Sequence, residues 1–421
     1  MQVRTQMYPN AVPLKFTTKE EGFQLLLESC YKGETALSNM PVFFLPENLY
    51  GEPDVLERND SHESIFGKFH YAVKEIKLAK NIKKEHIMEA AFNNYLIGKV
   101  QGFTPETFTI VNRDAEEFLL PFTEHNDTLR IIVEDIVQIM KGKQVTPTVG
   151  SLSFPWENYG MKVAERTKDI SLIPDVGEIK KSKLLQVGIT TLEDMANAEI
   201  GKSRISGISV KSLERWKLSA QALLQNNHTV LEKPRLPVAK TEIFLDLEGT
   251  DVFVLEGSEV KGDYLIGLLI RESNQEKYVS FFANNLNEEQ QILQQFLNLV
   301  RAGKDFVIYH YSSYEKTRLK ALFEKYGTSE ALRTLVLDRM VDLLPVLKRC
   351  VVLPTYSYSL KPVAKLLGFS WRAEIGAQDS IVLYFKYLED KDQKKREEII
   401  NYNEDDCRAT VVVKDFLARL S

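Results

Sequence analysis

The chain has 421 residues, of which 44% are hydrophobic and 27% are charged, and its formal net charge is −5. This length predicts two to three domains with ordinary cores, and the negative charge excludes a basic coat for nucleic acid without excluding local basic patches. There is no run of about 18 apolar residues and the first ten residues lack a secretory pattern, so we expect no membrane span and a cytoplasmic location.

Two segments rich in turn residues divide the chain. Residues 229–240, TVLEKPRLPVAK, carry two prolines, which interrupt helices and strand pairing and so indicate a linker. A second break is expected near 142–160, which is rich in Gly, Pro, Ser and Thr. The chain is therefore predicted to have an N-terminal domain at 1–145, a helical segment at 160–228 and a C-terminal domain at 241–421.

The N-terminal part combines two strand patterns with a helix pattern, at residues 51–56, 71–80 and 86–102. Asp54 opens the first apolar stretch, and Glu75 and Lys77 are alternate residues that face the same way on the second strand. An Asp followed by Glu-x-Lys on the paired strand can hold a metal ion and aim an ammonium at a phosphate or a water. The alternative is a surface strand that binds no metal.

The middle part, residues 172–196, places a Pro-x-Val-Gly turn before a lysine-bearing helix, and Thr191 is a candidate cap for the next helix. This pattern is similar to helix-hairpin-helix modules, in which turn amides and lysines contact the phosphate backbone without reading base sequence. Residues 204–216 are predicted to form a second, degenerate hairpin. The alternative is a helical spacer with solvated lysines. The residues that a binding module would use are Gly177, Lys180, Lys181 and Lys183.

The C-terminal part alternates strand and helix patterns. Strands are predicted at 243–249, 264–270, 278–283 and 306–310, with a helix at 287–302 and a helix-rich tail. This order predicts an α/β domain with a mixed sheet covered by helices.

Two acids stand on the first of these strands. Asp246 and Glu248 are two residues apart, so both side chains leave the same face of the strand. Neighbouring acids on an otherwise apolar strand repel each other and require a compensating charge. Carboxylate oxygens suit Mg²⁺ or Mn²⁺ better than zinc. The pair indicates a divalent-metal site, and the alternative is an edge strand with solvated acids.

Further acids occur later in the chain. Tyr402 and Asp406 are one helical turn apart and share a face. The carboxylate can hold a metal there while the phenol orients or deprotonates a water, or the residues form a solvent-facing acidic turn. Glu315 stands where the strand at 306–310 runs into a helix. It can aim another carboxylate at the same point or act as a helix-dipole acid.

These three elements, in this order, resemble the motifs of the DEDD family of 3′-to-5′ exonucleases, which has an RNase H-like fold. The Asp-x-Glu motif of the family matches Asp246 and Glu248, and its Tyr-x-x-x-Asp motif matches Tyr402 and Asp406. The resemblance extends over the whole C-terminal part.

The second family motif has an unusual form in this chain. Tyr314 and Glu315 stand at the usual Phe-Asp position, and Tyr311 stands at the usual Asn position. This form resembles the YprB-like branch of RNase H-like proteins. The segment 357–369 is similar to the one that leads a helix past the family's site.

The resemblance implies two-metal hydrolysis of phosphodiester bonds with Mg²⁺ or Mn²⁺, and Tyr402 would position the attacking water. It implies a 3′–5′ exonuclease acting on single-stranded DNA or RNA. An endonuclease or hybrid-cleaving ribonuclease on the same fold stays open, and so does a non-catalytic scaffold that binds nucleic acid. The implied metal ligands are Asp246, Glu248, Glu315 and Asp406.

The N-terminal part resembles the PD-(D/E)XK nucleases of the RecB- and Cas4-like kind, which implies a restriction-endonuclease-like α/β domain. The residues that carry this resemblance are Asp54, Glu75 and Lys77. A glutamine usual in the next helix is replaced by Ile87 or Glu89, and we expect the chain to begin after the family's extra first helix. No Walker loop is found, so ATP-driven unwinding is not expected.

Overall fold

The computed structural model describes residue 8 and residues 10–143, 147–150, 156–200, 205–255, 258–273, 275–373 and 376–420. The chain forms two compact units, Met1–Val145 and Thr146–Ser421, and each is described by itself. Part of the break predicted near 142–160 lies outside the described residues. None of the helices in these ranges has the length and apolar character that crossing a membrane requires.

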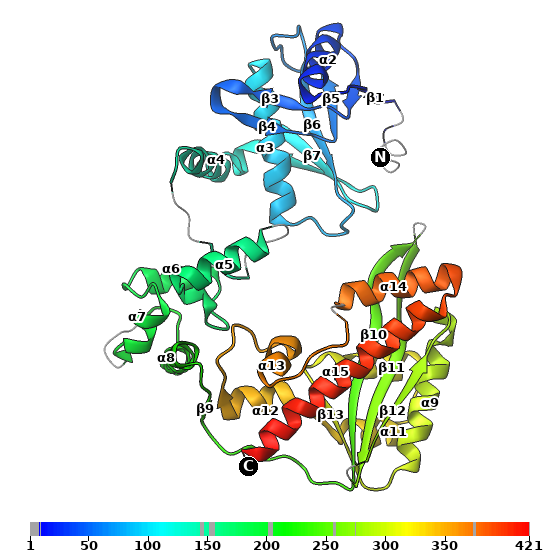
Figure 1. The fold of residues 1–421 in the computed structure, drawn as a ribbon. Helices are drawn as coiled ribbons and strands as arrows, with labels where there is room; N and C mark the ends of the chain where they lie inside the picture. Colours follow the sequence, from blue (N-terminus) through cyan, green and yellow to red (C-terminus); the bar gives the residue numbers. More distant parts are fainter. Residues whose placement is uncertain are drawn as a thin grey trace. The chain divides into compact units, whose positions relative to one another are not determined.

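The N-terminal unit contains a six-stranded sheet with the strand order β1-β2-β5-β6-β7-β8 (Figure 1). These strands are β1 (Val12–Pro13), β2 (Ala36–Ser38), β5 (Val55–Asn59), β6 (His70–Ile76), β7 (Thr107–Val111) and β8 (Glu117–Pro121). A separate hairpin consists of β3 (Val42–Phe44) and β4 (Leu49–Gly51), and the helices are α2 (Lys19–Lys32), α3 (Lys84–Gln101) and α4 (Asn126–Met140). β6 is antiparallel to β5 and parallel to β7, so the sheet is mixed.

The end of β6 brings a carboxylate into the core of this unit. Tyr71, Val73 and Glu75 alternate along the strand and are all buried, because alternate side chains point to the same face of a strand. α3 packs against this face through apolar residues such as Leu96. Glu75 therefore stands where the alternation of the strand would place an apolar side chain.

The second unit begins with a helical segment. Its helices are α5 (Glu157–Thr167), α6 (Glu178–Leu185), α7 (Leu192–Asn197) and α8 (Val210–Gln225). They enclose an apolar core that includes Leu184 and Trp216. Thr191 caps α7 as predicted, because its side chain accepts a hydrogen bond from the amide of Asp194 and the Asp194 carboxylate accepts one from the amide of Thr191.

The C-terminal part of the second unit contains a five-stranded sheet with the order β12-β11-β10-β13-β14. Its strands are β10 (Thr241–Leu255), β11 (Ser258–Glu272), β12 (Gln275–Phe282), β13 (Phe306–His310) and β14 (Met340–Asp342). The first three strands pair antiparallel, and β13 and β14 run parallel to β10, which confirms the predicted mixed sheet. The helices are α9 (Glu289–Ala302), α10 (Tyr314–Lys325), α11 (Glu330–Leu337), α12 (Leu343–Cys350), α13 (Leu360–Leu366), α14 (Ala377–Asp390) and α15 (Gln393–Arg419).

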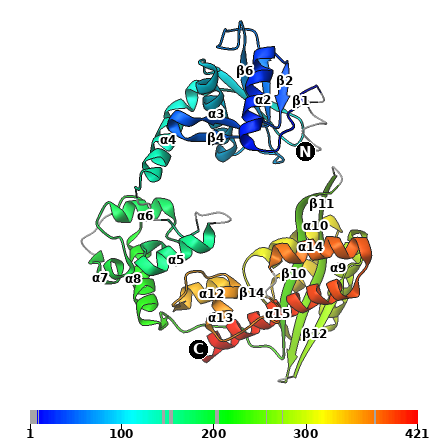
Figure 2. The same cartoon turned by 45° about the horizontal axis from the view of Figure 1, so that its top comes forward.

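Helices cover both faces of this sheet. Ile243 of β10 packs in a cluster with Phe296 of α9, whereas the next residue, Phe244, packs in a cluster with Cys407 and Val411 of α15. Because successive side chains of a strand point to opposite faces, α9 and α15 lie on opposite sides of the sheet. α15 crosses its face in both views (Figure 1 and Figure 2). Asp246 therefore projects from β10 toward the long helix that carries Asp406.

The predicted linker is structured at its start. β9 (Thr229–Val230) pairs antiparallel with β15 (Val351–Val352) of the C-terminal part. The Arg215 guanidinium of α8 also donates to the carbonyl oxygen of Val351, at 3.2 Å. The helical segment is thus joined to the C-terminal domain by backbone and side-chain hydrogen bonds within one unit.

Candidate functional site

Three carboxylates meet between β10 and α15. Asp246 and Glu248 of β10 and Asp406 of α15 each offer an oxygen atom, and these oxygens all lie within 4.8 Å of one another. Glu248 and Asp406 are buried, and Asp246 is partly exposed. Asp246 and Glu248 share one face of the strand, and α15 crosses that face. Acids that are 158 residues apart in the sequence, from 248 to 406, therefore lie together.

The electrostatics of this cluster are unfavourable without a cation. Burial raises the pKa of Glu248 to about 8 and that of Asp406 to about 6. Burial, followed by repulsion from Asp406 and Glu248, raises the pKa of Asp246 well above its ordinary value. A divalent cation would favour the ionised forms and supply the missing positive charge. Three oxygen donors of this kind fit Mg²⁺ or Mn²⁺.

An asparagine fixes the orientation of Asp246. Asn403 Nδ2 donates to Asp246 Oδ2 at 2.6 Å, and Tyr278 Oη donates to Asn403 Oδ1 at 2.7 Å. A Cβ atom added at Gly267 of β11 would lie 1.5 Å from Asn403 Oδ1, so only glycine fits under this amide. Sequence reasoning missed Asn403, although its place three residues before Asp406 on one helix was a usable signal.

A tryptophan fixes Asp406. Trp371 Nε1 donates to Asp406 Oδ1 at 2.7 Å. The next residue, Arg372, donates from its backbone amide and from Nε to the two carboxylate oxygens of Asp405, each at 2.8 Å, which ties this loop to α15. No spacing rule in the sequence connects Trp371 with Asp406, and sequence reasoning missed it.

Glu248 is held from the other side of the cluster. Tyr264 Oη donates to Glu248 Oε2 at 3.4 Å and lies 2.8 Å from Ser380 Oγ of α14. The Tyr264 ring stacks on Tyr384 of the same helix, with ring centroids 4.0 Å apart. This packing keeps the carboxylate of Glu248 directed at the cluster.

Glu315 lies near the cluster but outside its 4.8 Å group. It is buried at the start of α10, and its Oε2 lies 3.4 Å from Nδ1 of the buried His310. Burial raises the pKa of Glu315, and His310 opposes the rise. Repulsion from Glu315 is among the causes that raise the pKa of Asp246. The geometry thus brings three of the four predicted ligands together and pairs the fourth with a histidine.

Tyr402 lies on α15 one turn before Asp406, and it is buried. Burial and the charge of Asp406 raise its pKa above the ordinary value. The phenol is hydrogen-bonded to Asp406, which holds its hydroxyl beside the carboxylate cluster. Lys361 Nζ of α13 lies 4.9 Å from the Tyr402 ring centroid, and its charge lowers the pKa of Glu248 and Asp406. Sequence reasoning missed Lys361.

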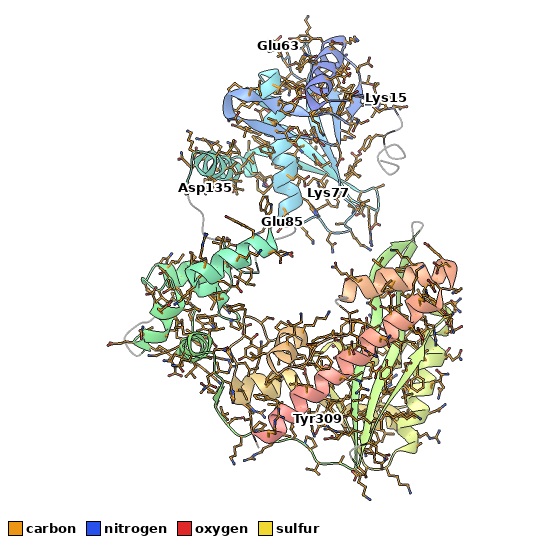
Figure 3. All side chains as sticks on the ribbon, viewed as in Figure 1. Lys15, Glu63, Lys77, Glu85, Asp135 and Tyr309 are labelled. Carbon is orange, nitrogen blue, oxygen red and sulfur yellow. The ribbon has the colours of Figure 1, made fainter. Side chains whose placement is uncertain are left out.

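In the N-terminal unit, the three predicted site residues also meet. Lys77, labelled in Figure 3, has its Nζ 3.4 Å from Glu75 Oε2 and 2.7 Å from Glu89 Oε2. Burial, followed by repulsion from Asp54, raises the pKa of Glu75 to about 8. Asn93 Nδ2 of α3 donates to Glu75 Oε1 at 2.6 Å. Asn93 thus contacts the carboxylate from the helix in which a glutamine was expected at Ile87 or Glu89.

The lysines of the helical segment do not form one exposed surface. Lys181 is 4% exposed, and its Nζ lies 2.8 Å from Oδ2 of the equally buried Asp169. The prediction that Lys181 contacts a phosphate backbone is therefore wrong, because this lysine completes an internal ion pair. Lys180 Nζ donates to the carbonyl oxygen of Asp175 and Lys183 Nζ to that of Ser206. A role for Lys180, Lys183 and Gly177, which precedes α6, stays a prediction.

Residues 243–418 match the model of the RNase_H_2 family, which belongs to the RNase_H superfamily. The C-terminal domain is therefore RNase H-like, as predicted, and this likeness supports a hydrolase that acts on nucleic acid with divalent metal ions. The family match does not reach the N-terminal unit or the helical segment, whose resemblances stay predictions. No curated protein matches the chain.

Proposed function

We propose that this protein is a metal-dependent 3′–5′ exonuclease that hydrolyses phosphodiester bonds in single-stranded DNA or RNA. The observation that carries the proposal is the group formed by Asp246, Glu248 and Asp406, whose oxygens lie within 4.8 Å of one another in an RNase H-like domain. Burial and mutual repulsion make these acids costly to ionise without a cation. A bound divalent cation would offset that cost and could then act on a phosphodiester bond.

The three acids would hold Mg²⁺ or Mn²⁺, and Glu315 would add a ligand directly or through water. When bound, such ions supply positive charge for the developing phosphate transition state and lower the pKa of water. Asn403 and Trp371 would keep the carboxylates of Asp246 and Asp406 in place through their hydrogen bonds. Such outer partners set ligand orientation in metal sites.

Tyr402 would orient the attacking water through its phenol group, which is held beside Asp406 by a hydrogen bond to that carboxylate. The charge of Lys361, which acts on both Glu248 and Asp406, would also attract the phosphate of the substrate. The reaction breaks the bond between phosphorus and the 3′ oxygen of the penultimate nucleotide, and water supplies the new oxygen.

The test uses Asp246→Asn and end-labelled DNA and RNA single strands with Mg²⁺ or Mn²⁺. We expect wild type to release mononucleotides from 3′ ends and the variant to lose at least about 100-fold in rate. The control is Glu397→Gln, which removes an exposed charge from α15, the helix that carries Asp406. Internal fragments would favour an endonuclease, and metal-independent strand binding without hydrolysis would favour a scaffold.

A second nuclease site in the N-terminal unit is the other candidate. It is favoured by the approach of Lys77 to the buried Glu75, whose charge also interacts with Asp54. We expect any such activity to survive Asp246→Asn and to disappear when Glu75→Gln is added. A double variant that still cleaves would remove Glu75 from consideration.

A further inference from the structure

Two cavities of the second unit meet beside the carboxylate cluster. The first has a volume of about 480 Å³ and reaches Asp246 and Asp406. The second, of about 450 Å³, lies along the turn before α6 and includes Gly177. The four residues that line both cavities are Pro174, Asp175, Tyr356 and Ser357. The two cavities therefore adjoin at these residues, and together they line a track that leads from the acids to the helical segment.

The walls of this track are held in place by contacts between the helical segment and the C-terminal domain. Arg215 of α8 donates to Tyr358 Oη at 3.3 Å, and Tyr358 Oη in turn accepts the backbone amide of Leu353 at 3.0 Å. Lys348 Nζ lies 3.7 Å from Asp175 Oδ2 across the first cavity. The loop that carries Tyr356 is thus fixed on both sides.

The chemistry of the track suits a nucleotide chain. Tyr358 is 5% exposed, but Tyr356, two residues earlier, is 38% exposed and lies where the cavities join. An accessible aromatic ring offers a stacking surface to any base. Lys348, whose ion pair with Asp175 is long at 3.7 Å, can exchange it for a phosphate, and Ser312 and Ser359 also line the first cavity. Each cavity has the volume of a small-molecule site.

We infer that this track binds single-stranded nucleic acid, with the terminal phosphodiester at the carboxylates and a neighbouring base stacked on Tyr356. Duplex bases already stack on each other within the helix and leave no free face for a side chain, so the platform selects unpaired strands. The inference rests on the proposed function and specifies its substrate. It also gives the helical segment a role through the Pro174–Asp175 turn and not through its lysines.

The experiment compares substrates that do and do not reach Tyr356. The probes are DNA and RNA oligomers of increasing length and the p-nitrophenyl ester of thymidine 5′-monophosphate, which holds a single nucleotide. Loss of one stacked base should raise the KM of Tyr356→Ala for the longer oligomers about 5- to 100-fold. This increase should exceed any change on the ester, and Tyr356→Phe should restore oligomer binding.

The control variant is Tyr159→Ala, an exposed tyrosine of the helical segment that lines neither cavity. We expect it to behave as wild type. Equal losses on ester and oligomers in Tyr356→Ala, or no loss on either, would overturn the inference. Strong dependence of a blunt duplex on Tyr356 would overturn the single-strand assignment.

Binding separates failure of the inference from failure of the proposed function. Wild type that hydrolyses neither oligomer nor ester with Mg²⁺ or Mn²⁺ would remove the proposed function. Fluorescence anisotropy of labelled single strands would then still test the track. Weaker binding by Tyr356→Ala, with recovery in Tyr356→Phe, supports it, and unchanged binding refutes it.

Discussion

The two units of the chain each place a carboxylate on a central strand and fix it with an asparagine from the covering helix. Asn403 donates to Asp246 and Asn93 donates to Glu75, each with a nitrogen-to-oxygen distance of 2.6 Å. The surrounding charges differ, because Asp246 meets two further carboxylates, whereas Glu75 interacts with one, Asp54, and lies 3.4 Å from the ammonium of Lys77.

This difference teaches what each arrangement requires. In the N-terminal unit, Lys77 lowers the pKa of Glu75 and already supplies a positive charge. In the C-terminal domain, Lys361 lowers the pKa of Glu248 and Asp406, but three carboxylates share the site, and their mutual repulsion adds to burial in raising the pKa of Asp246. We therefore expect divalent ions to bind the C-terminal site more tightly.

The largest expected effect concerns hydrolysis. Asp406→Asn should lower metal-dependent trimming of single strands at least about 100-fold, since it removes a negative charge that the ions need. Glu75→Gln should change the same rate little. Gel assays of end-labelled oligomers measure both variants. A larger loss for Glu75→Gln than for Asp406→Asn would reverse the ranking of the two sites.

A smaller effect is expected from the asparagine in the C-terminal domain. Asn403→Ala removes the donor that orients Asp246, which should weaken Mn²⁺ binding about 10- to 100-fold in calorimetric titration. Asn298→Ala, on an exposed position of α9, is the control. Unchanged Mn²⁺ affinity in Asn403→Ala would show that Asp246 needs no outer partner.

The corresponding change in the N-terminal unit should act on stability. Asn93→Ala leaves the buried Glu75 without its closest donor, which should lower the free energy of unfolding of that unit by about 1–3 kcal/mol. Urea titration measures the loss, and Asn81→Ala, on an exposed position before α3, is the control. If Mg²⁺ or Mn²⁺ abolished the loss, the N-terminal site would be a metal site after all.

The smallest effect is the dependence of thermal stability on pH. The pKa of Glu248 and that of Glu75 are both raised from 4.5 to about 8, so the folded protein keeps protons that the unfolded chain releases. The contribution of these two groups to the free energy of unfolding is therefore complete below pH 4.5 and is lost as the pH rises toward 8. In EDTA, the Tm should fall between pH 5.5 and pH 8, because the folded protein must release these protons over that range.

Added metal should then affect the two sites differently, which the Tm at pH 8 can measure. At pH 8, Mg²⁺ or Mn²⁺ should restore the part of the Tm that Glu248 costs, because bound cations stabilise ionised carboxylates. Glu248→Gln should remove this metal-sensitive part, and Glu75→Gln the metal-insensitive part. Identical responses of both variants to metal would abolish the distinction between the sites.

Local spacing explains which features were predictable. The step of two between Asp246 and Glu248 and the step of four between Tyr402 and Asp406 follow from strand and helix periodicity, so the sequence alone indicates shared faces. The family match at 243–418 covers all four of these residues. The convergence of β10 and α15 on one point follows from no local spacing, and only the resemblance to the DEDD family predicts it.

Contacts between distant segments explain what was missed. Trp371 reaches Asp406 only because Arg372 ties its loop to α15. A run of lysines in a sequence predicts solvent-exposed side chains, yet α6 directs Lys181 at the buried Asp169. Glu315 was expected to face the metal, but its side chain also lies beside His310. Trp371 is 35 residues from Asp406 and Lys181 is 12 residues from Asp169, so neither strand nor helix periodicity predicts these contacts.

Gly267 offers a way to disturb the C-terminal site without changing any of its acids. With no side chain at this point of β11, the Asn403 amide can sit flat on the sheet and α15 can approach closely. A single added methyl, as in Gly267→Ala, would overlap the Asn403 amide and force it to leave its place beside Asp246. Every acid would survive that substitution, but Asp246 would lose the donor that orients its carboxylate.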